Sequence, residues 1–70
     1  MKYNPTNFRN LMIEKDISAL KLGEELGIHR QTIGKHLKGT AEWKGETLMK
    51  LADYFDVSTD YLLGRTKFPH

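Results

Sequence analysis

The sequence predicts an all-α fold, a compact domain of five short helices. Apolar residues recur at intervals of three and four, which is the period of an amphipathic helix. Residues that start helices and residues that end them mark the chain at five places. The chain has 70 residues and no cysteine, so neither disulfides nor cysteine-held zinc can stabilise it. Packed helices remain the source of stability for a chain with 39% hydrophobic residues.

The first helix is predicted from a start signal at Asn4 and Pro5. Asn4 can cap the helix, and Pro5 suits the first helical position because its missing N–H costs nothing there. Phe8, Leu11 and Met12 follow at helical spacing and form the apolar stripe.

The second helix follows a break at residues 16–17 and is expected to begin at Ser18, a residue type that caps helices. Leu22 and Leu26 lie one turn apart on it. Gly27 ends it, because glycine readily adopts the left-handed conformation found at helix C-termini.

A third helix is predicted over about residues 30–38, with Ile33 and Leu37 facing inward. Gly39 ends this helix in the same way as the glycine before it. A loop at residues 40–44 then leads to the second half of the chain.

The last two helices follow this loop. The fourth is marked by four apolar residues at helical spacing, namely Leu48, Leu51, Ala52 and Phe55. Ser58 can cap the fifth, with Asp60 in its positive first turn. Val57 can pack on Leu62 across that turn, and Gly64 ends the helix.

The composition argues against a membrane or secreted protein. The longest apolar runs are about three residues, far short of the roughly 18 that span a bilayer. Met1 and Lys2 lead into a polar stretch, so no signal peptide is expected and the predicted location is the cytoplasm. We expect one domain over residues 1–64 and a short polar tail over residues 65–70.

Catalysis, a cofactor, a metal and a small-molecule ligand are not expected. The chain has no cysteine, no glycine-rich phosphate loop and no evident carboxylate pair. Ser18 and Ser58 are typical of helix caps rather than nucleophiles. His29 and His36 lie seven positions apart, but zinc sites need three or four ligands.

The charge is small in total and unevenly placed. The formal net charge is +2. Residues 28–45 hold four basic residues and one acidic residue, a net +3, whereas the rest holds seven basic and eight acidic residues, a net −1. This clustering suits a polyanionic partner. A merely solvated surface would give the same pattern, and charge alone does not separate the two.

The joint between the second and third predicted helices has the composition of a helix-turn-helix. Two helices that meet at a sharp angle need a residue that accepts positive φ at the corner, which Gly27 supplies. They also need a small residue where the backbones touch, which Gly23 supplies. Apolar side chains come from both helices and the turn: Leu22, Leu26, Ile28 and Ile33.

This stretch resembles the helix-turn-helix of the phage-repressor and Cro-like family, also called the XRE family. Residues 48–64, with the sequence LMKLADYFDVSTDYLLG, are similar to the family's closing pair of helices. Residues 32–39, TIGKHLKG, are similar to the end of its recognition helix. The resemblance covers about residues 8–64. It implies a lambda-repressor-like domain that binds double-stranded DNA as a homodimer, in a phage or bacterial repressor that reads the major groove with residues 30–38.

Several positions depart from the family pattern. Ala19 stands where a phosphate-binding Gln is usual, so one standard phosphate anchor is missing. His29 replaces the usual Ser or Thr cap, and His36 replaces an apolar or aromatic residue. Trp43 and Lys44 replace the usual Pro and helix cap of the loop.

The exposed surface of the third helix supplies candidate DNA contacts. Gln31, Lys35 and Lys38 fall roughly opposite its apolar residues, and the flanks carry Arg30, Thr32 and Gly34. By resemblance, Arg30, Gln31 and Lys35 occupy the positions that reach base edges. The chemistry agrees, because Arg and Lys suit the acceptors of guanine and Gln suits adenine. Candidate contacts to the DNA backbone or flanking positions are Ser18, His29, Thr32, Gly34, Lys38, Thr40 and Lys44.

Several positions keep two interpretations. Gly34 either allows close approach to the groove floor or reflects drift at an exposed site. His36 is expected to be a half-buried packing residue rather than a ligand, and Trp43 a loop anchor rather than part of a dimer surface. The dimer surface itself is expected around the fifth helix and tail, at Tyr61, Leu63 and Phe68.

The alternative function is a protein-binding module, such as an antirepressor or toxin partner, on the same fold. Ala19 and the modest net charge favour it slightly. Salt-dependent binding to mixed duplex DNA separates the two hypotheses, because only a DNA-binding protein releases counterions from phosphates.

Overall fold

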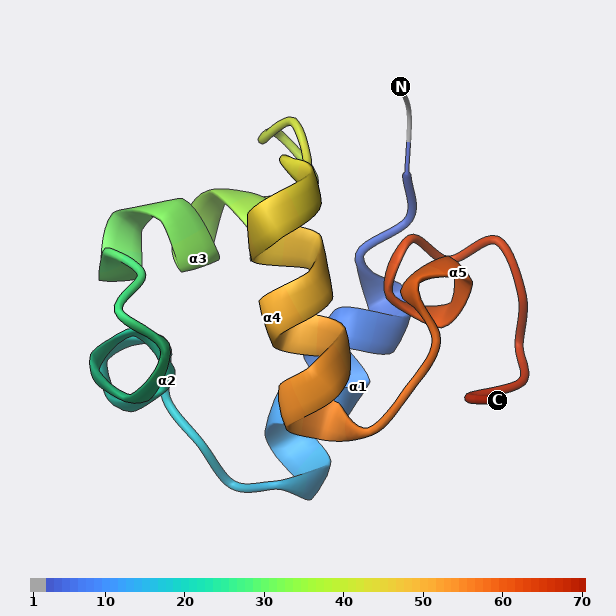
Figure 1. Cartoon of the computed structure of the whole chain (residues 1–70), viewed down its shortest axis with the longest axis horizontal. Coiled ribbons are helices and arrows are strands. Elements are labelled where there is room, and N and C mark those ends of the chain that lie inside the picture. The colour runs from blue at the N-terminus through green and yellow to red at the C-terminus, as the bar shows by residue number, and fades with distance from the viewer. Residues whose placement is uncertain (1–2) are drawn as a thin grey trace.

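A computed structural model describes residues 3–70, which fold into helices without a strand, as predicted. The helices are α1 (Thr6–Glu14), α2 (Ala19–Leu26), α3 (Arg30–Lys38), α4 (Gly45–Phe55) and α5 (Thr59–Leu62). Figure 1 shows α4 in the middle of the view, with α2 and α3 on one side of it and α5 on the other. The helix-turn-helix pair therefore lies at one end of the molecule, away from the C-terminus.

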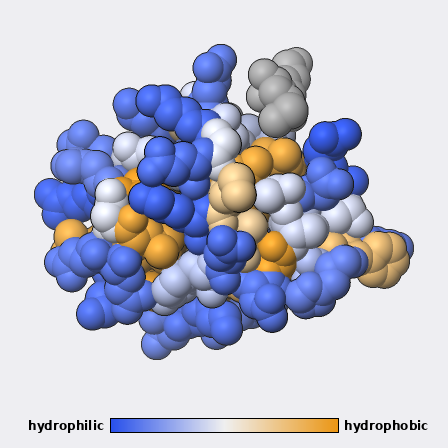
Figure 2. Space-filling view, viewed as in Figure 1, coloured by the Kyte–Doolittle hydropathy of each residue, from blue (hydrophilic) through white to orange (hydrophobic). Residues whose placement is uncertain are grey.

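All five helices contribute to one hydrophobic core. Its buried members are largely the predicted ones: Phe8, Leu11, Met12, Leu22, Ile33, Leu51, Ala52, Phe55 and Leu62. The predicted residues Leu26, Leu37, Leu48 and Val57 are partly buried against this core. In the same orientation as Figure 1, Figure 2 shows hydrophilic residues around small, separate apolar patches. Burial of this core supplies the main favourable free energy of folding.

The first helix begins one residue later than predicted. The α-helix starts at Thr6 rather than Pro5. Asn4 still supplies the predicted capping group, because its side-chain oxygen accepts the Thr6 backbone N–H at 2.9 Å. The serine caps of the later helices are confirmed. The Ser18 hydroxyl accepts a backbone N–H at 3.1 Å in α2, and the Ser58 hydroxyl does so at 3.1 Å in α5.

Two kinds of residue end the helices. Gly27 and Gly39 follow α2 and α3 with φ of 69° and 79°, the left-handed conformation predicted for them. Asp16 and Asp56 follow α1 and α4 with φ of 50° and 55°. Aspartate tolerates this region because its short polar side chain can bond locally. Only the first of these two breaks was predicted from the sequence.

The C-terminal residues pack back on the domain. The Asn7 side chain donates to the Thr66 carbonyl at 3.0 Å, and the Ser58 N–H donates to the Pro69 carbonyl at 2.7 Å. The predicted dimer surface needs correction at one residue, because Leu63 is buried beneath the end of α5. Phe68 is 61% exposed. Among residues 3–70, no helix is both long and apolar enough to cross a membrane.

Candidate nucleic-acid interface

The corner of the helix-turn-helix requires a glycine on α2. A Cβ on Gly23 would overlap the backbone carbonyl oxygen of Ile28. The backbones are this close because the Ile28 N–H donates to the Gly23 carbonyl at 2.9 Å. Together with the left-handed Gly27, this contact sets the angle between α2 and α3. Both glycine roles agree with the sequence prediction.

α3 begins at a histidine cap. The Nδ1 atom of His29 accepts the Gln31 backbone N–H at 3.1 Å. In the neutral ring the proton therefore lies on Nε2, and that N–H is not used by the cap. His29 is exposed, so its Nε2 can donate to a phosphate while Nδ1 still caps the helix. The cap and the predicted phosphate contact are compatible.

The predicted base-reading residues lie together on the exposed side of α3. Arg30, Gln31 and Lys35 are exposed, whereas Ile33 is fully buried. No side-chain hydrogen bond or ion pair between described residues occupies these three side chains. The two ion pairs of residues 3–70 join Lys50 to Glu46 and Arg65 to Asp60. The basic and amide groups of this face are therefore available to a ligand.

Three of the predicted flanking residues line two separate hollows, one of them shared with Arg30, and the other four lie outside both. Thr32 and Lys44 line one polar cleft of about 330 Å³ between α3 and the start of α4. His29 and Arg30 line a separate hollow of about 300 Å³ beside Gly23. The remaining predicted contacts are distributed along the chain, with Ser18 capping α2, Gly34 and Lys38 on α3, and Thr40 just after it.

Thr40 and Ser18 already make hydrogen bonds within the protein. The Thr40 hydroxyl donates to the Lys35 carbonyl at 3.3 Å, and the Ser18 hydroxyl accepts the Lys21 N–H. Lys44 precedes α4 without a side-chain cap, so the first N–H groups of that helix have no capping side chain.

The buried side of α3 differs from the prediction at His36. His36 is 1% exposed rather than half buried, while Leu37 is only partly buried. The imidazole stacks on Trp43 with ring centroids 3.9 Å apart and planes 21° from parallel. Trp43 also packs edge-on against Phe8 at 5.8 Å. Trp43 is therefore the loop anchor that was predicted, and it covers the imidazole that the sequence places in an aromatic slot.

Burial lowers the pKa of His36 below its usual value, because the charged imidazolium would lose its hydration. Nδ1 of His36 and Nε1 of Trp43 are both buried without a hydrogen-bond partner among the described residues. The cleft that His36 lines also carries charged groups of both signs: Glu42, Glu46, Lys44 and Lys50. His36 thus acts as a neutral packing residue beside a charged cleft.

The C-terminal end of α3 is held by two residues that the sequence analysis missed. The Tyr3 hydroxyl donates to the His36 carbonyl at 3.1 Å, and Nε of Arg9 donates to the Leu37 carbonyl at 2.6 Å. The His36 carbonyl also accepts the Gly39 N–H at 3.2 Å, so Tyr3 adds a second hydrogen bond there, and Arg9 binds the next carbonyl of the last turn. No sequence motif predicts these contacts, because a backbone carbonyl accepts a hydrogen bond whatever side chain its residue carries. Burial raises the pKa of the Tyr3 hydroxyl above its usual value.

The tight corner between α2 and α3 and the exposed polar surface of α3 are the features of a helix-turn-helix DNA-binding domain. Among residues 3–70, no three His, Cys, Asp or Glu side chains are grouped so that they could hold a metal ion. The family model of the Cro/C1-type HTH DNA-binding domain matches residues 7–67. The chain therefore belongs to this family, which confirms the resemblance seen in the sequence.

One similar protein is a relative from Bacillus subtilis (strain 168). It is the SPbeta prophage-derived uncharacterized HTH-type transcriptional regulator YonR, 44% identical over 52 residues. The match covers 74% of this chain and 48% of the relative, so the chain spans about half the relative's length. No solved structure matches the chain.

Proposed function

We propose that the protein binds specific sequences of double-stranded DNA as a homodimer and represses transcription of phage or bacterial genes. In this proposal α3 enters the major groove, where each base pair presents a distinct set of donors and acceptors. The observation that carries it is the exposed face of α3. Gln31 and Lys35 lie roughly opposite the buried Ile33, and Arg30 lies on the flank of the same exposed surface. None of the three side chains has a hydrogen-bond or ion-pair partner among residues 3–70.

The three side chains would divide the work by chemistry. Arg30 and Lys35 donate to the O6 and N7 acceptors of guanine, and Gln31 pairs with N6 and N7 of adenine. Lys38 and Lys44 contribute phosphate contacts at the end of α3 and the start of α4. The relative's name, a transcriptional regulator derived from a prophage, supports a regulatory role in a phage setting.

Selection from a randomised duplex library tests the proposal directly. The expected product is a symmetric site with two half-sites spaced by about 10 base pairs or a multiple of that. Polarisation titration of the selected duplex should then show affinity that falls as salt rises. The double variant Arg30→Ala/Lys35→Ala should lose most of that affinity, with Arg65→Ala as a control outside α3. Unchanged binding by the double variant would contradict the base-reading assignment.

A protein-binding role on the same fold is the second candidate, and one observation favours it. Ala19, at the position where the family usually has a phosphate-binding Gln, lines an apolar groove with Met12 and Leu37. If the protein shows no salt-dependent binding to mixed duplex DNA even at low ionic strength, this second function is preferred.

A further inference from the structure

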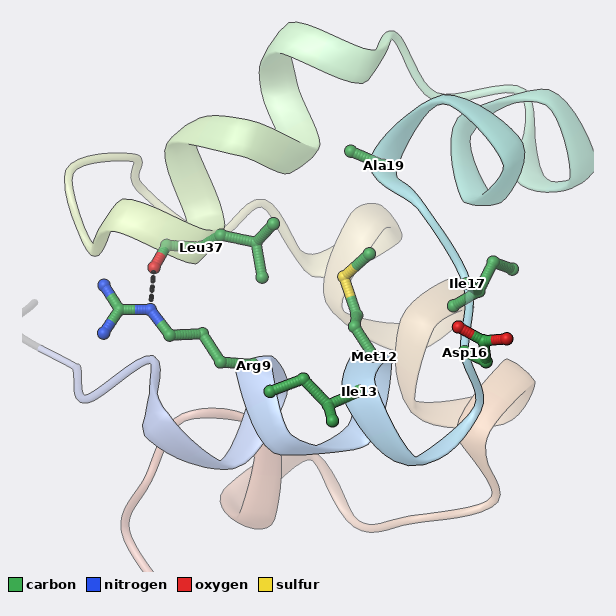
Figure 3. Close-up of a pocket in the computed structure, with 7 residues that line it drawn as sticks. All are labelled: Arg9, Met12, Ile13, Asp16, Ile17, Ala19 and Leu37. Carbon is green, nitrogen blue, oxygen red and sulfur yellow. Dashed lines mark hydrogen bonds between the residues drawn. The ribbon is translucent and has the colours of Figure 1, made fainter.

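An apolar groove runs between α1, the start of α2 and the end of α3. Its volume is about 600 Å³, and it is open to solvent along its length. Figure 3 shows the residues that line it: Arg9, Met12, Ile13, Asp16, Ile17, Ala19 and Leu37. None of the predicted base-reading residues lines this groove.

The centre of the groove contains an exposed apolar side chain. Ile13 is 76% exposed, the highest value among the large apolar residues of the described chain. Its neighbour Met12 is buried in the core. The groove therefore combines an exposed isoleucine with an apolar recess beside it. Each exposed apolar group of this kind gains free energy when a partner removes it from water.

The two ends of the groove carry opposite charges. Figure 3 shows Arg9 at one end and Asp16 at the other, with Met12 and Ile13 between them. Nε of Arg9 is held by the Leu37 carbonyl at 2.6 Å, which fixes the guanidinium at its end and leaves its two amino groups available. Neither Arg9 nor Asp16 takes part in the two ion pairs of residues 3–70.

We propose that this groove binds a second copy of the chain, with the two α1 helices antiparallel about a twofold axis. The axis passes between Met12 and Ile13. Arg9 and Asp16 lie at opposite ends of the groove, so a twofold axis through its middle brings Arg9 opposite the partner's Asp16 and the partner's Arg9 opposite Asp16. Ile13 then packs over the partner's Met12.

Self-complementarity is the reason for choosing a second copy as the occupant. A twofold contact brings the same patch together from both chains, so the patch must contain both halves of every interaction. The groove does: a protruding isoleucine, an apolar recess, a cation at one end and an anion at the other. A partner with a single sign of charge would match only one end of it.

The inference rests on the homodimer in the proposed function and gives that homodimer a surface. Stable interfaces bury about 1,200–2,000 Å² in total, more than one short helix and its groove supply, so the association is weak and concentration-dependent. Because the groove does not include Arg30, Gln31 or Lys35, the contact forms with or without DNA. Experiments in the absence of DNA therefore test it separately.

The absence of cysteine makes cross-linking a clean test. The variant Ile13→Cys carries a single thiol beside the proposed axis, and Met49→Cys carries one on α4 at a matched exposure of 62%. With a short bis-maleimide and no DNA, Ile13→Cys should form about tenfold more covalent dimer, because the twofold axis brings its two thiols together. Equal yields from the two variants would overturn the proposal.

Sedimentation equilibrium of Ile13→Asp and Asp16→Asn tests the two components of the contact. Ile13→Asp places like charges near the axis and should abolish self-association, while its melting temperature stays unchanged because the site is exposed. Asp16→Asn keeps a side chain that tolerates the left-handed backbone and should weaken association by up to about fivefold per ion pair. Asp53→Asn on α4 is its control.

The outcomes separate this inference from the proposed function. If Ile13→Asp associates like the unmodified chain, or if the unmodified chain stays monomeric, the second-copy contact is wrong. That result would leave DNA binding intact. Cross-linking through Ile13→Cys together with no affinity for any duplex would support the contact and overturn the proposed function instead.

Discussion

The two faces of α3 follow different rules. The buried face consists of Ile33 and His36, which pack in the core and against Trp43. The exposed face presents Arg30, Gln31 and Lys35, which make no side-chain contact that the fold requires. On this helix of nine residues, the side chains that stabilise the fold and those that are free for a ligand therefore point in different directions. The exposed face can change its sequence without loss of the fold, whereas the buried face cannot.

The largest expected effect is on the buried face. Ile33→Ala should lower the free energy of unfolding by about 2–5 kcal/mol, because it removes three carbons from a fully buried position. Lys35→Ala, two residues away on the exposed face, should change it by less than about 0.5 kcal/mol. Urea denaturation followed by circular dichroism measures both. Similar losses for the two variants would remove the distinction between the faces.

On the exposed face, the expected loss is in DNA recognition. Gln31→Ala should reduce discrimination at one base pair by about 1–3 kcal/mol while the fold stays intact. Lys38→Ala should weaken binding to all sequences evenly and lower the slope of log affinity against log salt by about 1. Polarisation titrations with matched and mismatched duplexes at several salt concentrations distinguish them. If Gln31→Ala weakens binding to all duplexes equally, Gln31 contacts the DNA backbone and not a base.

The sequence predicted the helices well because start and stop residues act locally. Ser18, Ser58 and the glycines after α2 and α3 behave as their chemistry dictates, whatever lies elsewhere in the chain. The burial of His36 was underestimated, because periodicity marks a side as apolar but does not show which ring will cover it. Trp43, seven residues away in a loop, provides that cover.

The contacts from the N-terminal segment could not be predicted. Tyr3 and Arg9 bind backbone carbonyls of α3 that lie 33 and 28 residues away in sequence. A carbonyl has no sequence signature, so only the folded chain reveals that α1 and the segment before it hold the C-terminal end of α3. For the same reason the groove between Arg9 and Asp16 was not predicted, although three of its residues, Arg9, Met12 and Ile13, are spaced at helical intervals on α1.

His36 makes the buried face sensitive to pH. Its pKa is lowered by burial in the folded state and stands near 6.5 in the unfolded chain, so the unfolded chain binds more protons as pH falls. Stability should therefore decrease as pH falls below about 6.5, by at most about 1.4 kcal/mol per pH unit for this one proton. Above that pH the imidazole is neutral in both states and contributes no slope.

The variant His36→Phe tests this origin, because it keeps an aromatic ring against Trp43 and has no proton to bind. Thermal melts between pH 5 and pH 8 should show a smaller loss of stability on acidification than the unmodified chain shows. His29, which is exposed, provides the control in His29→Asn, a substitution that retains an N-cap. Equal slopes for His36→Phe and the unmodified chain would place the dependence on other groups.

The smallest expected effect lies at Gly34, on the boundary between the two faces. A Cβ at this position would meet nothing within 4 Å, and its φ is not in the left-handed region, so the fold does not require glycine there. Gly34→Ala should therefore raise the free energy of unfolding by about 0.5–1 kcal/mol, because alanine loses less backbone entropy in a helix. We expect the same variant to bind its selected duplex more weakly, since the added methyl group separates α3 from the groove floor. Denaturation and polarisation titration on one preparation measure both changes. A more stable variant with unchanged affinity would show that the glycine reflects drift at a solvent-facing position and not close approach to DNA.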